Sequence, residues 1–374
     1  MVANETIKKK GWRRLVLFIA VILSTCFFLT ACSDEEIQDS AELVIGIIGE
    51  ILEAANETTE PTPTDTSHES IPAHTDDVTV NVNGNMEVHF IDVGQSDATL
   101  FIHNGKVMLF DVAMASRGDE LVEYIQNLGI TYIDVVVITH PHDDHAGGAA
   151  ELLNCENIEV GILYAPDFIE LMESETDTPG WYDDMVDAID CIDAERNEGI
   201  PEEKQTSIWH FPRNENGEFA KFNIGDAVVE FLAPLEDEYS DKNDYSICAK
   251  ITYGNIDIMM TGDATSSVER TLINEGYDLD VEIFQSSHHG SDTGNSREFL
   301  DAMTPECIVI SCGMKNRYSH PIKSVMDLFK ELDLPVYRTD ESGNVIMTTD
   351  GTNYSFNVEP GTYTSGAEYK AQGD

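Results

Sequence analysis

The 374-residue sequence has few basic residues. Its 21 lysines and arginines stand against 70 aspartates and glutamates, which gives a formal net charge of −49. Beyond the N-terminal segment, no stretch gathers enough lysine and arginine to follow a phosphate backbone. This scarcity argues against tight, nonspecific binding of nucleic acid. The acidic surplus itself is typical of a well-solvated surface.

Cysteine is also scarce, and its spacing argues against a scaffold of disulfides or cysteine-bound zinc. The chain has seven cysteines, and no Cys-x-x-Cys pair occurs. Five lie in the body of the chain: Cys155, Cys191, Cys248, Cys307 and Cys312. An odd number without metal-binding spacing favours buried single thiols. The Gly-x-Ser-x-Gly motif of serine hydrolases is missing as well.

A long apolar run occurs at the N-terminus. Five basic residues between positions 8 and 14 precede LVLFIAVILSTCFFLT, and Leu-Thr-Ala-Cys follows at 29–32. This order resembles the signal and lipobox of bacterial lipoproteins. We therefore expect residues 1–31 to be a lipoprotein signal peptide, Cys32 to carry the lipid, and the protein to lie on the extracytoplasmic face of the cell membrane. A plain transmembrane anchor is the alternative, although the run is short for a span.

Residues 32–84 have too few large apolar side chains to build a core. They are rich in Asp, Glu, Thr, Ser and Pro, as in NETTEPTPTDTSHESIPAHTDD. This composition predicts an acidic Thr/Pro/Ser-rich tether. Within it, residues 41–57 have helical spacing and predict one short helix.

From Met86 the pattern changes to apolar runs separated by turns and helical segments. Three strands are expected between 86 and 112, with a hairpin at Asn104-Gly105, then a helix stopped by Gly129 and a buried strand over 134–139. Strands and helices alternate again up to residue 350. Hairpins mixed with helices indicate sheets covered by helices. We therefore expect a single α+β domain over 85–352, an insertion at 165–215 and a C-terminal tail at 353–374.

Histidine and aspartate gather directly after the strand at 134–139, in ITHPHDDHAGG. His140 and His142 are two apart, so both imidazoles face the same side of an extended chain and can bind one metal ion. Asp144 and His145 lie where a helix begins and turn toward a second site. Asp143 should point away. The strand end is therefore a platform for ligands of two adjacent metal ions.

Further candidate ligands follow in three later segments. Two ions about 3.5–4 Å apart need a bridging carboxylate, and Asp263 in a Thr-Gly-Asp turn is the candidate. His288 and His289 follow in SSHHGSDTG, and His320 in NRYSHP. Imidazole and carboxylate ligands suit zinc, manganese or iron, and we expect two divalent ions, zinc or manganese. Such a pair lowers the pKa of a shared water to about 7 and directs the hydroxide at phosphorus or a carbonyl carbon.

Taken in order, these motifs resemble a known family. H-x-H-x-D-H after a strand, then T-G-D, then H-H-G-S, is similar to the metallo-beta-lactamase superfamily, and more closely to the hydrolase domain of the DNA-uptake channel protein ComEC and its stand-alone relatives. Local matches include FIDVGQSDA, NDYSICAKITYG, TGDA, NRYSHP and VYRTDESG. The resemblance implies a four-layer αββα sandwich and a dinuclear metal-dependent hydrolase.

The resemblance also implies roles for individual residues. The implied metal ligands are His140, His142, Asp144, His145, Asp263 and His289, with His320 as the alternative to His289. His288 is expected to orient the attacking hydroxide or contact substrate, and a ligand role for His289 leaves His320 as a phosphate contact or general acid. Together with Asp144, these two histidines are the expected catalytic residues. Asp92, Asp97 and Asp111 are expected to hold the histidine loop, with an ordinary turn role as the alternative.

The sequence departs from the family pattern in its middle region. Many members supply a third histidine to the first metal from the place where this chain has Asn243-Asp244-Tyr245-Ser246. The first site is therefore expected to be underfilled, with Asn243 and Ser246 beside it or in contact with substrate. An open position is what catalysis needs. His210 is the histidine nearest this region, and its strand-like setting favours packing over metal binding.

These observations predict a lipid-anchored extracellular phosphodiesterase. Its substrate is expected to be a cell-envelope phosphoester or nucleic acid, and no protein partner is evident. Basic residues near the histidine motifs supply a local grip on phosphate: Arg297, Lys315, Arg317 and Lys323. A hydrolase of carboxylic esters, lactones or beta-lactams and a noncatalytic binding lipoprotein remain the alternatives.

Overall fold

The computed structural model describes residues 84–372 apart from 168–171, 173–177, 202–203 and 215. The predicted signal peptide, Cys32 and the helix at 41–57 lie outside the described residues, as does the predicted tether except for its last residue. All elements below belong to one compact unit, residues 68–200 and 207–374; of the other unit, 1–67 with 201–206, only Pro201 and 204–206 are described. Within the described part of the chain, no helix is both long enough and apolar enough to cross a membrane.

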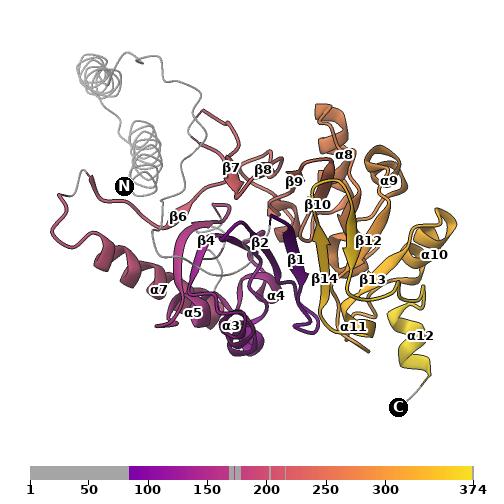
Figure 1. Ribbon diagram of the computed structural model, residues 1–374, viewed down its shortest axis with the longest axis horizontal. Coiled ribbons are helices and arrows are strands. Elements are labelled where there is room, and N and C mark those ends of the chain that lie inside the picture. Colours follow the sequence, from indigo (N-terminus) through magenta and orange to yellow (C-terminus); the bar gives the residue numbers. More distant parts are fainter. Residues whose placement is uncertain (1–83, 168–171, 173–177, 202–203, 215, 373–374) are drawn as a thin grey trace, which may run out of the picture. The chain divides into compact units, whose positions relative to one another are not determined.

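The strands form two mixed sheets (Figure 1). The eight-stranded sheet has the spatial order β15 (Tyr354–Phe356), β14 (Val345–Thr349), β1 (Met86–Phe90), β2 (Thr99–His103), β3 (Lys106–Phe110), β4 (Tyr132–Val137), β5 (Glu159–Tyr164), β6 (Trp209–His210). The seven-stranded sheet has the order β13 (Val336–Arg338), β12 (Cys307–Ile310), β11 (Ile283–Gln285), β10 (Ile256–Met260), β9 (Ala249–Tyr253), β8 (Ala227–Phe231), β7 (Lys221–Ile224).

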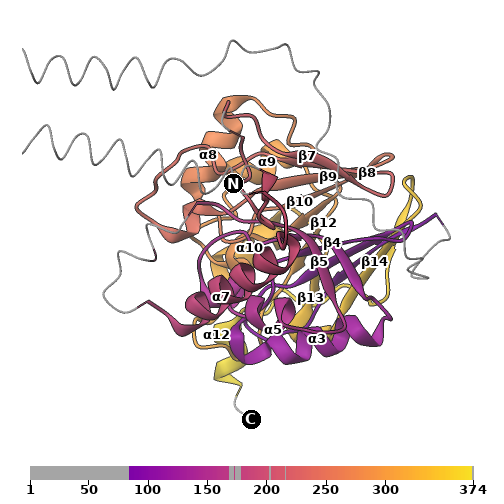
Figure 2. The same cartoon turned by 90° about the vertical axis from the view of Figure 1, so that its left-hand side faces the viewer.

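Helices cover the outer face of each sheet. One set follows the first strands: α3 (Gly118–Asn127), α4 (Asp143–Ala146), α5 (Ala149–Leu153) and α7 (Gly180–Arg196). The other set lies in the second half: α8 (Ser266–Glu275), α9 (Arg297–Met303), α10 (Lys323–Glu331), α11 (Thr339–Ser342) and α12 (Gly366–Ala371). Figure 2 shows α3 and α5 on one side of the strands and α8 and α9 on the other.

Strands that are buried on both faces explain the four layers. Leu100 and Ile102 of β2 pack with residues of α3, α5 and α7, whereas Phe101 between them lies in the cluster shared by the two sheets. Alternation of this kind follows from the two-residue period of a strand. A third cluster joins the second sheet to α8, α9 and α10. The predicted αββα sandwich is confirmed.

The three strands expected between 86 and 112 and the helix stopped by Gly129 form as predicted, and the strand expected over 134–139 lies at Tyr132–Val137 (β4). The β2–β3 hairpin turns through Asn104 and Gly105, whose positive φ angles of 50° and 76° suit Asn-Gly. Both sheets then switch to parallel pairing, β3 to β6 in one and β10 to β13 in the other. Because parallel strands end at the same edge, the turns after β3, β4, β10, β11 and β12 can meet there. This edge positions the candidate site.

The last residues differ from the expected tail. β15 pairs with β14, and α12 begins at a capping box formed by Ser365 and Glu368. The Gly366 N–H donates to the Pro321 carbonyl at 2.9 Å, and Lys370 Nζ donates to the Arg317 carbonyl at 3.1 Å. Strand pairing and a helix cap depend on partners distant in sequence, which composition does not reveal. The C-terminal segment therefore braces the loop that carries His320.

Candidate metal centre

The candidate ligands follow three strands. β4 leads to His140 and His142 and then, through the single turn of α4, to Asp144 and His145; β10 leads to Asp263, and β11 leads to His289. His140 Nε2 and His142 Nδ1 lie 2.9 Å apart, as expected for two side chains that face one point. The carboxylate of Asp143 instead accepts the Ala115 N–H, so it points away as predicted.

Asp263 stands between two groups of imidazoles. Its Oδ1 lies 3.0 Å from His145 Nε2 and 3.9 Å from His289 Nε2. Its Oδ2 lies 3.7 Å from His140 Nε2 and 3.3 Å from His288 Nε2. Each carboxylate oxygen therefore faces a separate pair of nitrogens, which is the arrangement that a bridging ligand of two metal ions requires. Asp144 completes the Oδ1 side, because its Oδ2 lies 3.4 Å from His289 Nε2.

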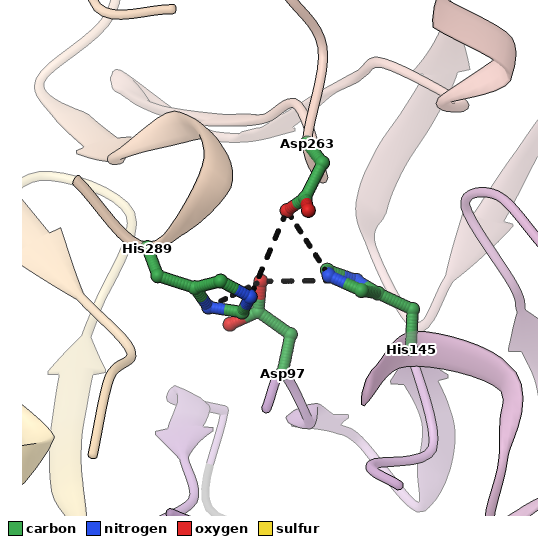
Figure 3. A group of neighbouring side chains, drawn as sticks. All are labelled: Asp97, His145, Asp263 and His289. Atoms are coloured by element: carbon green, nitrogen blue, oxygen red, sulfur yellow. Dashed lines mark ion pairs between the residues drawn. The ribbon is translucent and has the colours of Figure 1, made fainter. Parts of the chain in front are cut away.

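Asp97 lies close to the same imidazoles but on their far side. Figure 3 shows Asp97 and Asp263 approaching His145 and His289 from opposite directions. The Asp97 carboxylate is 3.9 Å from Nδ1 of each histidine, whereas Asp263 faces Nε2. Asp97, His145, Asp263 and His289 nevertheless each offer one atom within 4.8 Å of the other three, so Asp97 is a further candidate ligand, beyond the role of holding the histidine loop that was expected for it. Gln285 Nε2 donates to Asp97 at 2.9 Å and holds the carboxylate behind the two rings.

Unpaired atoms at the centre match the expected metal ligands. Nε2 of His145, Nε2 of His289 and Oδ1 of Asp263 are buried, and none of them makes a well-directed hydrogen bond, although Nε2 of His145 and Oδ1 of Asp263 are 3.0 Å apart. A buried polar atom without a partner costs about 1–3 kcal/mol, and native proteins rarely leave three of them together. Because these three atoms converge, the donor set fits a divalent cation.

The Nδ1 atoms of the same histidines are all engaged. His145 Nδ1 donates to Asp111 at 2.7 Å, and His289 Nδ1 donates to the Ser311 carbonyl at 3.0 Å. Contacts of this kind fix the ring tautomer and leave Nε2 free for a metal. His140 Nδ1 lies 3.0 Å from the Thr139 hydroxyl, which donates to Asp111. Asp111 thus contacts His145 directly and His140 through Thr139, two of the expected ligands, which supports its expected role of holding the histidine loop.

The two consecutive histidines occupy an unusual backbone region. The backbone φ angles of His288 and His289 are 51° and 53°, values that residues other than glycine rarely adopt. Asn295 stabilises this turn, because its Nδ2 donates to the carbonyls of Ser287 and Ser291. Glu269 in turn accepts the Asn295 N–H at 2.6 Å. This network directs adjacent imidazoles to opposite oxygens of Asp263.

His289 and His320 occupy different places. His289 reaches Asp144 and Asp263 as described above, whereas His320 Nδ1 lies 3.5 Å from Gln95 Nε2. The His320 ring is near-parallel to His289, with centroids 6.2 Å apart. This geometry favours His289 as the ligand and leaves His320 beside the centre. His288 adds an imidazole on the side where the sequence lacks the mid-chain histidine.

The local charges perturb the histidines strongly. Burial alone would lower the pKa of His289, but the carboxylates of Asp263, Asp97 and Asp144 raise it to about 9. Burial likewise lowers the pKa of His145, but the carboxylates of Asp263 and Asp111 raise it well above its usual value. Burial and the neighbouring imidazoles lower the pKa of His320 to about 4. Without metal, therefore, protons on His145 and His289 offset the gathered carboxylates.

The remaining predicted residues have mixed outcomes. Ser246 Oγ accepts the Asp263 N–H at 3.1 Å and so positions the bridging carboxylate. The N–H of Asn243 donates to Asp241, and its Oδ1 is buried without a partner. Asp92 is exposed and accepts the Gly94 N–H, so it has the turn role that the sequence left open.

The structure pairs two of the basic residues elsewhere. Arg297 binds Asp301 and Glu331, and Lys323 binds Asp327. Their charges are therefore largely balanced by surface partners, whereas Lys315 and Arg317 are the other two basic residues of the set.

Sequence reasoning missed several residues that orient the ligands: Thr139, Gln285, Ser311 and Asn295. Each contacts a residue from another segment, as described above. Thr139 and Gln285 do carry one signal, because both are polar residues at the ends of otherwise apolar strands.

Comparison with known proteins gives consistent results. The family profile described as "Metallo-beta-lactamase superfamily" matches residues 91–313. The chain is 24% identical over 298 residues to "ComE operon protein 3" of Bacillus subtilis (strain 168), covering 75% of this chain and 35% of that protein. It is 28% identical over 258 residues to "Competence protein ComA" of Neisseria gonorrhoeae, covering 67% and 30%.

The chain thus spans about a third of the length of the curated relatives that it matches. Among solved structures, the metallo-beta-lactamase fold protein YhfI from Bacillus subtilis aligns with a TM-score of 0.42 and 12% identity, covering 71% of this chain and 99% of that one.

Proposed function

The chain belongs to the metallo-beta-lactamase superfamily and is a metal-dependent hydrolase, and from this premise we propose that it cleaves phosphodiesters. The observation that carries the proposal is the division of Asp263 between two groups of imidazoles. Two adjacent cations suit a phosphodiester, since they can stabilise both the attacking and the leaving oxygen. Relatives named "Competence protein ComA" and "Recombination protein 2" favour nucleic acid among the candidate substrates.

The residues of the site have different expected roles. The expected ligands are His140 and His142 on one side, Asp144, His145 and His289 on the other, and Asp263 between them. Two divalent ions, which we propose to be zinc or manganese, supply when bound the Lewis acidity and positive charge that hydrolysis needs. His288 and His320 lie beside this centre, where each can donate or accept a hydrogen bond at a substrate oxygen. Burial of His140 and His145 keeps water from competing for the Nε2 atoms.

The substrate class can be tested with three reporters. The full chain, purified in detergent and stripped with a chelator, is reloaded with manganese or zinc and assayed on bis(p-nitrophenyl) phosphate, p-nitrophenyl acetate and nitrocefin. Fastest turnover of the phosphodiester is expected. Faster turnover of the acetate or of nitrocefin would point to an ester or beta-lactam hydrolase, and no turnover by protein with full metal content would favour a binding role.

We further propose that the enzyme is lipid-anchored and extracytoplasmic. The support is the sequence of residues 1–32, with basic residues, an apolar run and Cys32 in order. The wild-type protein should enter the detergent phase of a cloud-point separation and lack residues 1–31 by mass. Cys32→Ala should remain unprocessed. A wild-type mass that retains residues 1–31 would instead indicate an uncleaved anchor.

A further inference from the structure

The loop between β12 and α10 exposes two large apolar side chains beside the metal centre. Met314 is 44% exposed and Tyr318 is 46% exposed; we call residues 314–318 the lip. The Tyr318 ring lies near-parallel to His320, with centroids 5.5 Å apart. His320 is in turn near-parallel to His289, as described above. A row of flat rings therefore leads from an expected metal ligand to solvent.

The lip is held firmly in place. Asn316 Nδ2 donates to the carbonyls of Gly313 and His320, at 2.8 and 2.6 Å, and its Oδ1 accepts the N–H of Tyr318. Helix α12 braces the same loop from outside. An exposed aromatic side chain on a fixed loop is prepared for binding, because little conformational entropy is lost when a ligand arrives.

Arg317 gives this surface a positive charge. Its Cζ lies 4.5 Å from the centre of the Tyr318 ring, and the guanidinium donates to the Tyr318 hydroxyl. The structure, within its described residues, places no carboxylate at ion-pair distance from Arg317. The hydrogen bond with Tyr318, and more weakly the charges of Asp144 and Asp143, raise the pKa of Arg317. The guanidinium is thus exposed and forms no ion pair with a described carboxylate. It lies close enough to the metal centre for the charges of Asp144 and Asp143 to act on it.

We propose that Tyr318 and Arg317 form a docking surface for a planar aromatic ring carried by the substrate, next to the phosphoryl group at the metal centre. The inference rests on the proposed phosphodiesterase function. The guanidinium that lies over the Tyr318 ring offers its outer face to a substrate ring, and such stacking does not depend on the identity of the ring. Arg317 adds attraction for a neighbouring anionic group.

The charge on Arg317 selects between two kinds of substituent. An exposed tyrosine alone would also suit a quaternary ammonium group, through a cation–π contact. Here a guanidinium already lies over the ring, and it repels a second cation. A flat, neutral or anionic group therefore fits the lip, and a choline head group does not.

The affinity of the protein for phosphate monoesters tests the docking surface at the lip without requiring catalysis. Titration calorimetry on the metal-loaded protein compares thymidine 5′-phosphate with deoxyribose 5-phosphate, in which a hydroxyl replaces the base. It also compares phenyl phosphate with methyl phosphate, and includes phosphocholine. Wild-type protein should bind at least one ring-bearing ligand about tenfold or more tightly than its ring-free partner. Preference for the thymidine or the phenyl ligand identifies the ring as a nucleobase or an aryl group.

Substitutions distinguish the contribution of the Tyr318 ring from that of the Arg317 charge. Tyr318→Leu should bring each pair of ligands to within about twofold, while affinity for the ring-free ligands stays unchanged. Tyr318→Phe should restore the preference. Arg317→Lys keeps the charge and loses the plane, so it should weaken the ring preference; Arg317→Gln should also weaken the ring-free anions. Lys330→Gln removes an exposed charge at the end of α10 and serves as the matched control.

Three results would overturn the proposal: equal affinity of wild-type protein for ring-bearing and ring-free ligands, an unchanged preference in Tyr318→Leu, or tightest binding of phosphocholine. Hydrolysis of methyl p-nitrophenyl phosphate tests the proposed function separately. A protein that binds rings at the lip but hydrolyses no phosphodiester would contradict the phosphodiesterase and leave the docking surface standing.

Discussion

Asp263 is the side chain on which both groups of imidazoles depend. Because its two oxygens face different pairs of nitrogens, Asp263→Asn should reduce the bound metal from two ions to one or none. Asp144→Ala removes a contact on one side and should cost one ion. Both variants should lose at least about a hundredfold in phosphodiesterase activity, since the charge that stabilises the transition state is lost. Elemental analysis of the dialysed protein gives the metal content.

Asp143→Asn is the matched control. The side chain of Asp143 accepts the Ala115 N–H and points away from the centre, and asparagine can still accept that bond. Metal content and activity should match the wild type. A full complement of metal in Asp263→Asn would remove the bridging role.

The histidines also set how metal binding depends on pH. The pKa of His289 is raised to about 9, so below pH 9 its imidazole carries a proton that a metal must displace. The apparent affinity should therefore fall by about tenfold for each unit that pH drops from 9 toward 7, and more steeply where His145 releases a proton as well. Calorimetry in buffers of different ionisation enthalpy counts the released protons. An affinity that is constant over this range would contradict the protonation of His289.

Local sequence indicated the candidate ligands better than the residues that orient them. His140, His142, Asp144 and His145 lie within six positions after one strand, so their spacing already implies a common direction. Several orienting residues arrive from elsewhere: Ser311, which accepts the His289 Nδ1–H, lies after β12, and Gln285, which holds Asp97, ends β11. A hydrogen bond between segments so far apart has no local signature.

Glycine at a strand end controls how closely two elements approach. Gly262, between β10 and Asp263, has a φ of 50°, and a Cβ there would lie 2.8 Å from the Thr139 side chain. Gly262→Ala should therefore destabilise the protein by about 1–2 kcal/mol from backbone strain, with about 1–3 kcal/mol more from the steric clash. It should also weaken metal binding, because Thr139 orients His140. Urea unfolding of the metal-free protein measures the first effect, and metal titration the second.

Gly276→Ala isolates the backbone term. Gly276 ends α8 with a φ of 76°, and a Cβ there meets nothing within 4 Å. Gly276→Ala should lower the free energy of unfolding by only about 1–2 kcal/mol and leave the metal affinity unchanged. Equal effects of the two substitutions on metal binding would show that the contact with Thr139 is unimportant.

At the level of elements, strong local signals were sufficient for the hairpins and long helices but not for edge strands. The β2–β3 hairpin follows from Asn-Gly between alternating apolar residues. β15, by contrast, is three residues long with half-exposed side chains, and its pairing with β14 creates the strand. For the same reason the expected tail could not be recognised as part of the fold.

The net charge of the whole molecule should control how anionic substrates approach. A chain with a net charge of −49 repels an oligonucleotide, and salt screens this repulsion over about 8 Å at physiological ionic strength. Raising sodium chloride from about 20 to 150 mM should therefore lower KM for a short oligonucleotide. The effect should be smaller for methyl p-nitrophenyl phosphate, which carries one charge. An increase of KM with salt, as counterion release from a basic groove produces, would contradict this expectation.

The contacts of α12 make the surroundings of His320 depend on a helix that contributes no expected ligand. Gly366 and Lys370 hold the backbone on either side of His320. Proteolytic removal of α12 should therefore leave both sheets and the expected ligands assembled while it loosens His320 and the lip.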